Sequence, residues 1–216
     1  MVSIPKYHYT ADINAHIAIC VPVRDNVTAK FALSLANLTA KCVEQKIKYS
    51  LHMVMGSEVA MQRQQLVDEA LNTDCTHILW IDSDMTFPSH IVKGLLSHNK
   101  DVIACNYSTR VPPHRPVAFK DPEDLELRVG VASGIEEIYA IGMGAMMVKR
   151  SVYETMDRPH FSVVWNDNYT NLTGEDLYFC NKAQEYGFKI WLENDLSKSI
   201  GHTGTKTFTI KGDCCD

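Results

Sequence analysis

The apolar and polar positions of the chain form two kinds of segment in its first half. Short apolar runs predict buried strands, and longer segments with apolar residues three or four positions apart predict amphipathic helices. The order strand, helix, strand predicts right-handed crossovers and a mainly parallel sheet with helices on both faces. The predicted strands are residues 16–23, 49–56, 76–82 and 101–107, and the predicted helices are residues 26–46, 57–73 and 88–99.

The second half has a less regular pattern. Residues 108–119 contain three prolines and predict a loop, and residues 120–134 are charged and are expected at the periphery. We also predict a strand at 136–150 interrupted by two glycines, helices at 151–157 and from about 174, and short strands at 189–194 and 197–202. Because no internal repeat or linker interrupts the pattern, the sequence predicts a single domain over residues 1–216.

Composition narrows the class of protein. The 216 residues are 45% hydrophobic and 22% charged, which is typical of a globular protein, and the net charge of -5 argues against a nucleic-acid binder. The chain shows neither a signal peptide nor an apolar run of membrane-spanning length, so we expect a cytoplasmic protein. Four of the seven cysteines lie in apolar segments and are expected to be core residues in a reducing compartment, namely Cys20, Cys75, Cys105 and Cys180.

The stretch "HILWIDSDMTF" places Asp82 and Asp84 at the end of an apolar strand. Ligands of parallel sheets bind beyond the carboxyl ends of the strands. Residues i and i+2 of an extended chain point the same way, so both carboxylates could face one Mg²⁺ or Mn²⁺ bound together with a diphosphate. One carboxylate could instead bind the metal and the other a sugar hydroxyl. The alternative is a turn in which Asp84 precedes the helix after Pro88.

Two later segments carry further candidate chemistry. Glu175 and Asp176 stand at the predicted start of a helix, where acids either interact favourably with the helix dipole or serve as a general base. His202, in "IGHTGTK", could complete a metal shell, and Lys206 could neutralise a phosphate.

Three features of the first half and the middle of the chain complete the set. Arg63 is assigned to the exposed side of helix 57–73, where it is either solvated or available to a phosphate. Gly142 and Gly144 allow either close approach of a ligand or a bulge in a strand. The end of the first strand could seat a base or ribose through Pro22, Val23, Arg24 and Asp25, although Asp25 could instead cap the next helix.

The order of these motifs resembles that of glycosyltransferases with the GT-A fold, in particular small family-2-like enzymes of bacteria and phages. The similarity runs through "VPVRD", "QRQQLVDEAL", "HILWIDSDMTFP", "AIGMGAMMVKR" and "GEDLYFCNKAQEYGFKIWLENDLSKSIGH". It implies a Rossmann-like α/β domain with a nucleotide-sugar-binding half at about residues 16–105 and an acceptor and catalytic half at about 106–206. It also implies sugar transfer from a UDP- or GDP-type nucleotide-diphosphate sugar to a carbohydrate or other hydroxyl acceptor, with Mn²⁺ or Mg²⁺.

The resemblance assigns roles by position. It implies that Asp84 and His202 are metal ligands, that Asp82 lies near the metal and the ribose, and that Asp176 is the general base with Glu175 beside it. It further implies donor-binding roles for Pro22, Val23, Arg24, Asp25, Arg63, Ser83, Met143, Gly144 and Lys206.

Several alternatives stay open at this stage. The chain lacks the membrane helices and the QxxRW-type signature of processive relatives, and the stereochemistry could be retaining rather than inverting. A nucleotidyltransferase and a non-catalytic carbohydrate-binding module are the other candidates, although "VPVRDNVTAK" lacks the glycine-rich loop of the former. Tyr107, Trp165 and Tyr169 could stack on sugar rings or could pack in the core. Assembly into a homo-oligomer is also left open.

Overall fold

The computed structural model describes residues 15–110, 112–121, 132–165, 168, 170 and 172–204. The strands are β1 (His16–Val23), β2 (Lys48–Met55), β3 (His77–Ile81), β4 (Met85–Thr86), β5 (Val102–Ala104), β6 (Ala118–Phe119), β7 (Ile135–Ile138), β8 (Ala140–Ile141), β9 (Ala145–Lys149), β10 (Val164–Trp165), β11 (Leu172–Thr173), β12 (Ile190–Glu193) and β13 (Gly201–His202). The helices are α1 (Ala29–Glu44), α2 (Val59–Leu71), α3 (Ile91–Leu96), α4 (Arg150–Thr155), α5 (Glu175–Glu185) and α6 (Asn194–Ser197).

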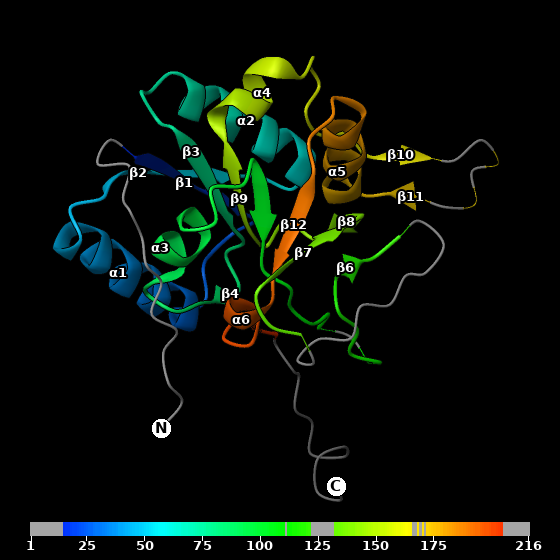
Figure 1. Ribbon diagram of the computed structural model, residues 1–216. Helices are drawn as coiled ribbons and strands as arrows, with labels where there is room; N and C mark the ends of the chain where they lie inside the picture. The colour runs from blue at the N-terminus through cyan, green and yellow to red at the C-terminus, as the bar shows by residue number, and fades with distance from the viewer. Residues whose placement is uncertain are drawn as a thin grey trace, which may run out of the picture.

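A seven-stranded sheet in the order β2-β1-β3-β9-β5-β12-β7 forms the centre of the fold (Figure 1). Strands β2, β1, β3, β5 and β12 run in one direction, while β9 and β7 run in the other. The prediction of a mainly parallel sheet is therefore confirmed. The sequence pattern did not indicate that β9, from the second half of the chain, lies between β3 and β5.

Helices cover both faces of the sheet, as predicted. Helices α2, α4 and α5 contribute buried residues to one face, and α1, α3 and α6 contribute them to the other (Figure 1). The two faces arise because successive side chains of a strand point in opposite directions. In β1, Ala18 and Cys20 pack under α2, whereas Ile17 and Ile19 pack under α1.

The first helix is shorter than its predicted span of 26–46 and starts at a different cap. Thr28 is the N-cap residue, and its hydroxyl oxygen accepts a hydrogen bond from the Phe31 amide at 3.1 Å. Asp25, the capping candidate from the sequence, lies three residues further back and is exposed. Capping by threonine satisfies one of the unpaired amide groups at a helix start.

The prediction of a strand over residues 197–202 is wrong in its first part. Ser197 is instead the last residue of α6, which starts directly after Glu193, whose carboxylate caps the helix by accepting a hydrogen bond from the Leu196 amide. Only the end of the segment forms a strand, β13, which pairs antiparallel with β4 so that His202 stands opposite Met85. This pairing brings His202 next to the "DSD" segment.

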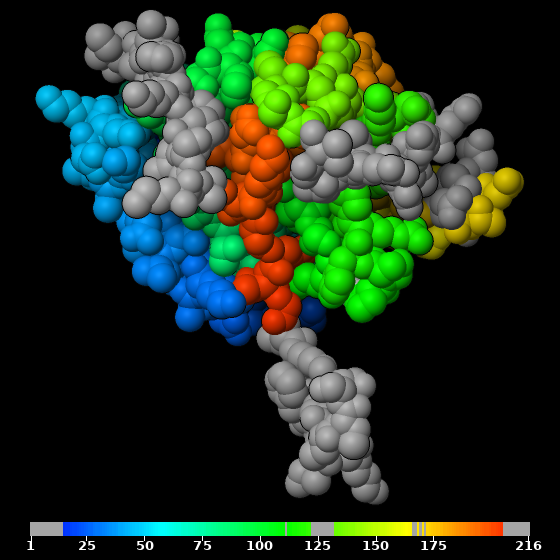
Figure 2. Space-filling view, turned by 60° about the horizontal axis from the view of Figure 1, so that its bottom comes forward, coloured from blue at the N-terminus to red at the C-terminus, as the bar shows by residue number. Residues whose placement is uncertain are grey.

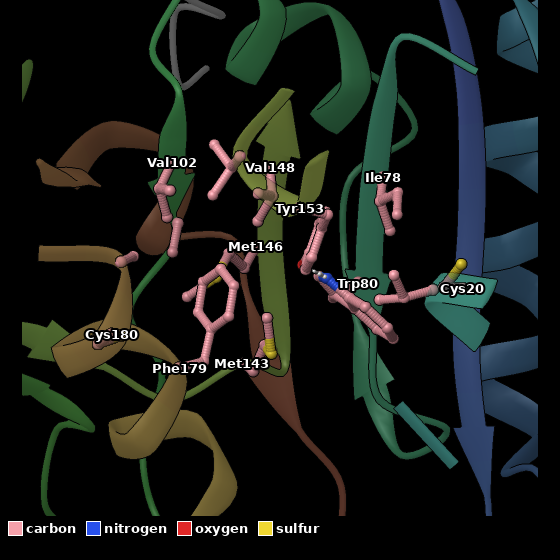
Figure 3. Packing of buried hydrophobic residues seen from close by; sticks show 14 of the residues in the cluster. Cys20, Ile78, Trp80, Val102, Met143, Met146, Val148, Tyr153, Phe179 and Cys180 are labelled. Carbon is pink, nitrogen blue, oxygen red and sulfur yellow. Dashed lines mark hydrogen bonds between the residues drawn. The ribbon is translucent and has the colours of Figure 1, made fainter. Parts of the chain in front are cut away.

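The larger core cluster is built around Trp80 (Figure 3). The Trp80 indole Nε1–H donates a hydrogen bond to the Tyr153 hydroxyl at 2.7 Å, and the ring meets Phe161 edge-on at 5.5 Å. The four cysteines predicted to be core residues are all buried and free. Among the described residues, no helix has both the length and the apolar character that a membrane span needs.

Replacement of Tyr153 by phenylalanine should lower the free energy of unfolding by about 1–3 kcal/mol, because the buried Trp80 N–H loses its acceptor. Urea unfolding followed by tryptophan fluorescence measures this change. Tyr186→Phe is the control, since it removes the hydrogen bond from a partly exposed Tyr186 hydroxyl to Asp157, and a change within about 0.5 kcal/mol is expected. Equal losses in the two variants would contradict the assignment.

Candidate functional site

A cleft of about 310 Å³ lies beyond the carboxyl ends of β1 and β3. Its walls come from both halves of the chain. Predicted site residues that line it are Pro22, Arg24, Arg63, Asp82, Ser83, Asp84, Glu175 and His202. The residues that the sequence did not indicate are Gly56, Ser57, Val59, Gln62 and Arg110. This is the edge at which open α/β sheets bind ligands.

The two aspartates of "DSD" lie in a turn and have different ionic partners. The Met85 amide donates a hydrogen bond to the Asp82 carbonyl at 3.1 Å, which closes a turn, so the extended geometry expected from the sequence is wrong. Asp82 accepts a hydrogen bond from Arg63 Nη2 at 2.8 Å. Asp84 instead pairs with Arg110, whose Nη1 lies 2.7 Å from its Oδ2. Each carboxylate therefore has a cationic partner of its own.

Arg63 is buried, not exposed as expected, with only 2% of its side chain accessible. Its Nη2 binds Asp82, its Nε donates to Glu175 Oε1 at 3.3 Å, and the guanidinium lies 5.3 Å from the centre of the Trp80 ring. Burial alone would lower the pKa of Arg63, but the nearby carboxylates outweigh this effect and raise it. Arg63 thus joins the "DSD" segment to the start of α5.

The signal for burial of Arg63 was present in the sequence. Arg63 stands three and four residues before Leu66 and Val67 on α2, which is the spacing of one helix face. A charged residue at that spacing implies buried partners of opposite charge, and these come from segments that only the tertiary fold brings close. Among the described residues, the buried Nη1 of Arg63 has no hydrogen-bond partner, so a ligand oxygen or water could satisfy it.

Arg63→Met should lower the free energy of unfolding by about 3–5 kcal/mol, since it leaves carboxylates in a largely buried place without their cation. The matched control is Arg158→Met. Arg158 pairs with Asp68 at 2.9 Å, but both side chains are exposed, so a loss of at most about 1 kcal/mol is expected. Chemical denaturation of both variants at pH 7.5 checks the difference, and similar losses would contradict a buried ion-pair network.

Asp84 and His202 form the part of the cleft that suits a divalent cation. Asp84 Oδ2 and His202 Nε2 are 3.4 Å apart, and His202 Nδ1–H donates to the Ser108 carbonyl at 2.9 Å. Metal-binding histidines usually donate their second ring N–H in this way, which leaves the other nitrogen for the metal. Mg²⁺ and Mn²⁺ often take few protein ligands and fill their shell with phosphate oxygens and water. The donor set therefore fits such an ion.

Asp84 and His202 each shift the pKa of the other. Burial would raise the pKa of Asp84, but the hydrogen bond and charge of His202, together with the charge of Arg110, outweigh it and hold that pKa below its ordinary value. The hydrogen bond to Asp84 in turn raises the pKa of His202. Asp82, the third predicted metal ligand, is bound to Arg63, and no cluster of three or more metal-binding side chains occurs among the described residues.

Glu175 and Asp176 occupy the first turn of α5, as predicted. Glu175 lines the cleft, whereas Asp176 is not among the lining residues and accepts a hydrogen bond from the Leu177 amide at 2.8 Å. Burial, followed by the charge of Glu175, raises the pKa of Asp176 to about 6. A carboxylate with such a pKa can accept a proton readily at neutral pH.

The residues at the end of β1 and in the loop after it lie in different surroundings. Pro22 and Arg24 line the cleft, but Asp25 is exposed outside its lining. The Val23 side chain is buried, and its carbonyl accepts hydrogen bonds from the Gly56 amide at 3.0 Å and from Gln62 Nε2 at 2.6 Å. Gln62 also donates to the Val54 carbonyl, so this residue, which the sequence did not indicate, ties together the ends of β1 and β2.

The glycines at 142 and 144 make room for Tyr107. A Cβ atom at Gly144 would lie 2.8 Å from Tyr107 Cζ, and one at Gly142 would lie 2.6 Å from its hydroxyl. The Gly144 amide donates to the Tyr107 hydroxyl at 3.0 Å. Tyr107 is therefore buried beneath this segment and does not stack on a sugar, and Met143 belongs to the core rather than to a donor surface.

The remaining candidate residues from the sequence are Trp165, Tyr169 and Lys206. Trp165, on β10, is 55% exposed and is free to stack on a ring. Tyr169 and Lys206 lie outside the described residues.

Comparison with known proteins adds to this geometry. The family model Anp1 matches residues 35–119, and no curated protein sequence matches the chain. The structure of A197 from STIV is 16% identical with a TM-score of 0.55 and covers 92% of this chain and 99% of that chain. The catalytic domain of Drosophila β1,4-galactosyltransferase 7 with xylobiose is 14% identical with a TM-score of 0.54, covering 90% and 77% respectively.

A third structure, TarS of S. aureus in complex with UDP, is 12% identical with a TM-score of 0.50 and covers 88% of this chain. This chain spans 61% of that one. At such identities the likeness concerns the fold. Together with the seven-stranded sheet and its strand directions, it shows that the chain has the GT-A fold of these glycosyltransferases.

Proposed function

We propose that this protein transfers a sugar from a nucleotide-diphosphate sugar to a hydroxyl acceptor in a metal-dependent, inverting reaction. One observation carries the proposal: a single cleft at the carboxyl edge of the sheet gathers Asp84, His202 and Glu175 with three arginines, from segments more than a hundred residues apart. A carbohydrate-binding module would not need this combination of carboxylates, histidine and buried guanidinium.

The donor is proposed to lie across the ends of β1 and β3. Pro22 and Arg24, which line the cleft, are the proposed contacts of the nucleoside, and Asp84 and His202 are the proposed ligands of a divalent cation. When bound, Mn²⁺ or Mg²⁺ supplies positive charge to the diphosphate and makes it a better leaving group. Arg63 holds Asp82 and Glu175 in fixed positions, so the cleft is organised before the substrate binds.

Asp176 is the proposed general base. Its carboxylate takes the proton of the acceptor hydroxyl, the hydroxyl oxygen attacks the anomeric carbon, and the bond from that carbon to the phosphate oxygen breaks. The nucleoside diphosphate leaves with the electron pair of that bond. The raised pKa of Asp176 supports this role, because a base is most effective when its pKa approaches the working pH.

A UDP sugar is the first donor to test. One similar structure, a mutant of the Drosophila enzyme, was solved with manganese, UDP-Gal and xylobiose, and another, TarS, was solved with UDP. These ligands were bound by those proteins, and we use them only to decide which donor to test first.

The test is a thermal-shift panel of UDP and GDP sugars with Mn²⁺ or with EDTA, followed by an assay for nucleoside diphosphate release and NMR of the product. The proposal expects metal-dependent stabilisation by donors of one nucleotide, release of that nucleoside diphosphate, and inversion at the anomeric carbon. Retention would overturn the inverting step and Asp176 as its base. Pyrophosphate release from a nucleoside triphosphate would indicate a nucleotidyltransferase instead, and no stabilisation by any donor would overturn the whole proposal.

A further inference from the structure

We propose that Arg110 is a donor-binding residue that exchanges partners: it holds Asp84 in the ligand-free protein and moves to the diphosphate of the donor when Asp84 binds a divalent cation. This inference rests on the proposed function and adds to it a binding residue and an order of events. It predicts that the metal and the nucleotide bind cooperatively, with Arg110 as the link between them.

The contacts of Asp84 carry the first step of the argument. Arg110 Nη1 lies 2.7 Å from Asp84 Oδ2, and His202 Nε2 lies 3.4 Å from the same oxygen. A cation bound by Asp84 and His202 would compete with the guanidinium for that oxygen. A cation that binds Asp84 through Oδ2, the oxygen that faces His202, therefore competes with Arg110 for it.

The hydrogen bonds between the two ends of the loop that carries Arg110 do not involve the Arg110 side chain, so a change of its partner need not break them. The Thr109 amide donates to the Arg115 carbonyl at 2.8 Å, and the Arg115 amide donates to the Thr109 hydroxyl at 3.0 Å, so the turn is closed by its own hydrogen bonds. Two residues before Arg110, the Ser108 carbonyl holds His202. In Figure 2 the green segment lies beside the orange-to-red segment, in agreement with the hydrogen bond between Ser108 and His202.

The exposure of the Arg110–Asp84 pair and the charge of a diphosphate explain why Arg110 would change partners. The Arg110 side chain is 51% exposed and that of Asp84 is 21% exposed, so the guanidinium reaches the cleft from the solvent side and its ion pair is weak. A diphosphate carries more charge than one carboxylate and accepts two parallel hydrogen bonds from a guanidinium. Arg110 lines the cleft, so its new partner would bind within reach of it.

Linkage between the two ligands then follows. Without nucleotide, binding of a cation at Asp84 must break the Arg110 pair, which lowers the affinity of the site for the metal. With a diphosphate present, Arg110 has a better partner, and this penalty disappears. By reciprocity, the metal raises the affinity for the nucleotide by the same factor.

The experiment measures Mn²⁺ binding to the full chain by calorimetry and by the EPR signal of free Mn²⁺, with and without UDP or GDP. The variants are Arg110→Gln and the matched control Arg115→Gln. The control removes the same charge from the same loop, but Arg115 is exposed and does not line the cleft. In Arg110→Gln we expect Mn²⁺ alone to bind about fivefold more tightly, and the enhancement by nucleotide to fall by about the same factor.

Each possible result tests either the exchange of Arg110 or the proposed function. Equal Mn²⁺ affinity and equal enhancement in wild type and Arg110→Gln would overturn the exchange while leaving the proposed function intact. The same gain in Arg115→Gln would reduce the effect to general charge and would also overturn it. Weaker nucleotide binding with unchanged affinity for Mn²⁺ alone would also overturn the exchange, because Arg110 would then bind phosphate without competing for Asp84. If wild type binds neither Mn²⁺ nor nucleotide in any combination, the proposed function itself fails.

Discussion

Asp84→Asn should abolish metal-dependent binding of the donor and reduce sugar transfer by about a thousandfold. Asparagine keeps the shape of the side chain but removes the charge that, with His202, is proposed to hold the cation. Calorimetric titration of Mn²⁺ in the presence of the donor identified by the thermal-shift panel measures the loss directly, and a steady-state assay measures the rate.

The control for this prediction is Asp101→Asn. Asp101 is also ion-paired, with Lys149 Nζ at 3.0 Å, but it is half exposed and does not line the cleft. Its variant should bind Mn²⁺ and donor as wild type does. Undiminished metal binding in Asp84→Asn would remove Asp84 as a ligand, and loss of binding in both variants would point to a general effect of charge.

Asp176→Asn should keep donor binding and lose about two to four orders of magnitude in the rate of transfer, the range expected when a general base is removed. The donor contacts proposed for Asp84 and His202 are untouched by this change. Comparison of donor affinity with turnover therefore separates a base from a binding residue. A variant with normal turnover would exclude Asp176 as the base and leave Glu175, the acid that lines the cleft, as the next candidate.

The raised pKa of Asp176 predicts how turnover and the stability of the fold change with pH. Its pKa is raised from 3.8 to about 6, so the folded protein binds the proton more tightly than the unfolded chain does. Turnover of the wild type should rise with pH through about 6 as the base becomes ionised. Ionised Asp176 lowers the stability of the fold, an effect absent below the unfolded-state pKa of 3.8 and complete above about pH 6.

The stability of the same variant tests this reasoning without any assay of activity. At pH 7.5, Asp176→Asn should be more stable than wild type by about 3 kcal/mol, and the difference should disappear near pH 4. Urea unfolding at the two pH values measures it. A variant that is less stable at pH 7.5 would show that the carboxylate is stabilised by its surroundings, contrary to the raised pKa.

Local patterns were sufficient for most elements of the first half. The apolar run that became β1 and the periodic segments that became α1 and α2 each bury one or two faces, and this requirement leaves a period in the sequence. The position of β9 between β3 and β5 left no such trace, because any apolar strand could fill that place. The short helix α6 depends on one capping carboxylate, which a pattern of apolar positions does not register.

The site was predictable in its residue types but not in its pairings. The sequence indicated Asp82, Asp84, Glu175 and His202. Acidic residues at a strand end and at a helix start, together with a histidine later in the chain, are an unusual combination. It placed Arg63 on the wrong side of its helix and did not indicate Arg110 or Gln62. The partners of these side chains lie far away along the chain, and their roles depend on which segments meet.

The sequence by itself determined the α/β class, the main elements and the acids and histidine of the candidate site, since periodicity and residue chemistry are local properties. Only the tertiary structure decided that Asp82 pairs with Arg63 and Asp84 with Arg110, and that Tyr107 fills the space left by the missing side chains of Gly142 and Gly144. The physical reason is the same in each case. Electrostatic and packing energies depend on distances of a few ångströms, and those distances are set by the sheet that brings remote segments together.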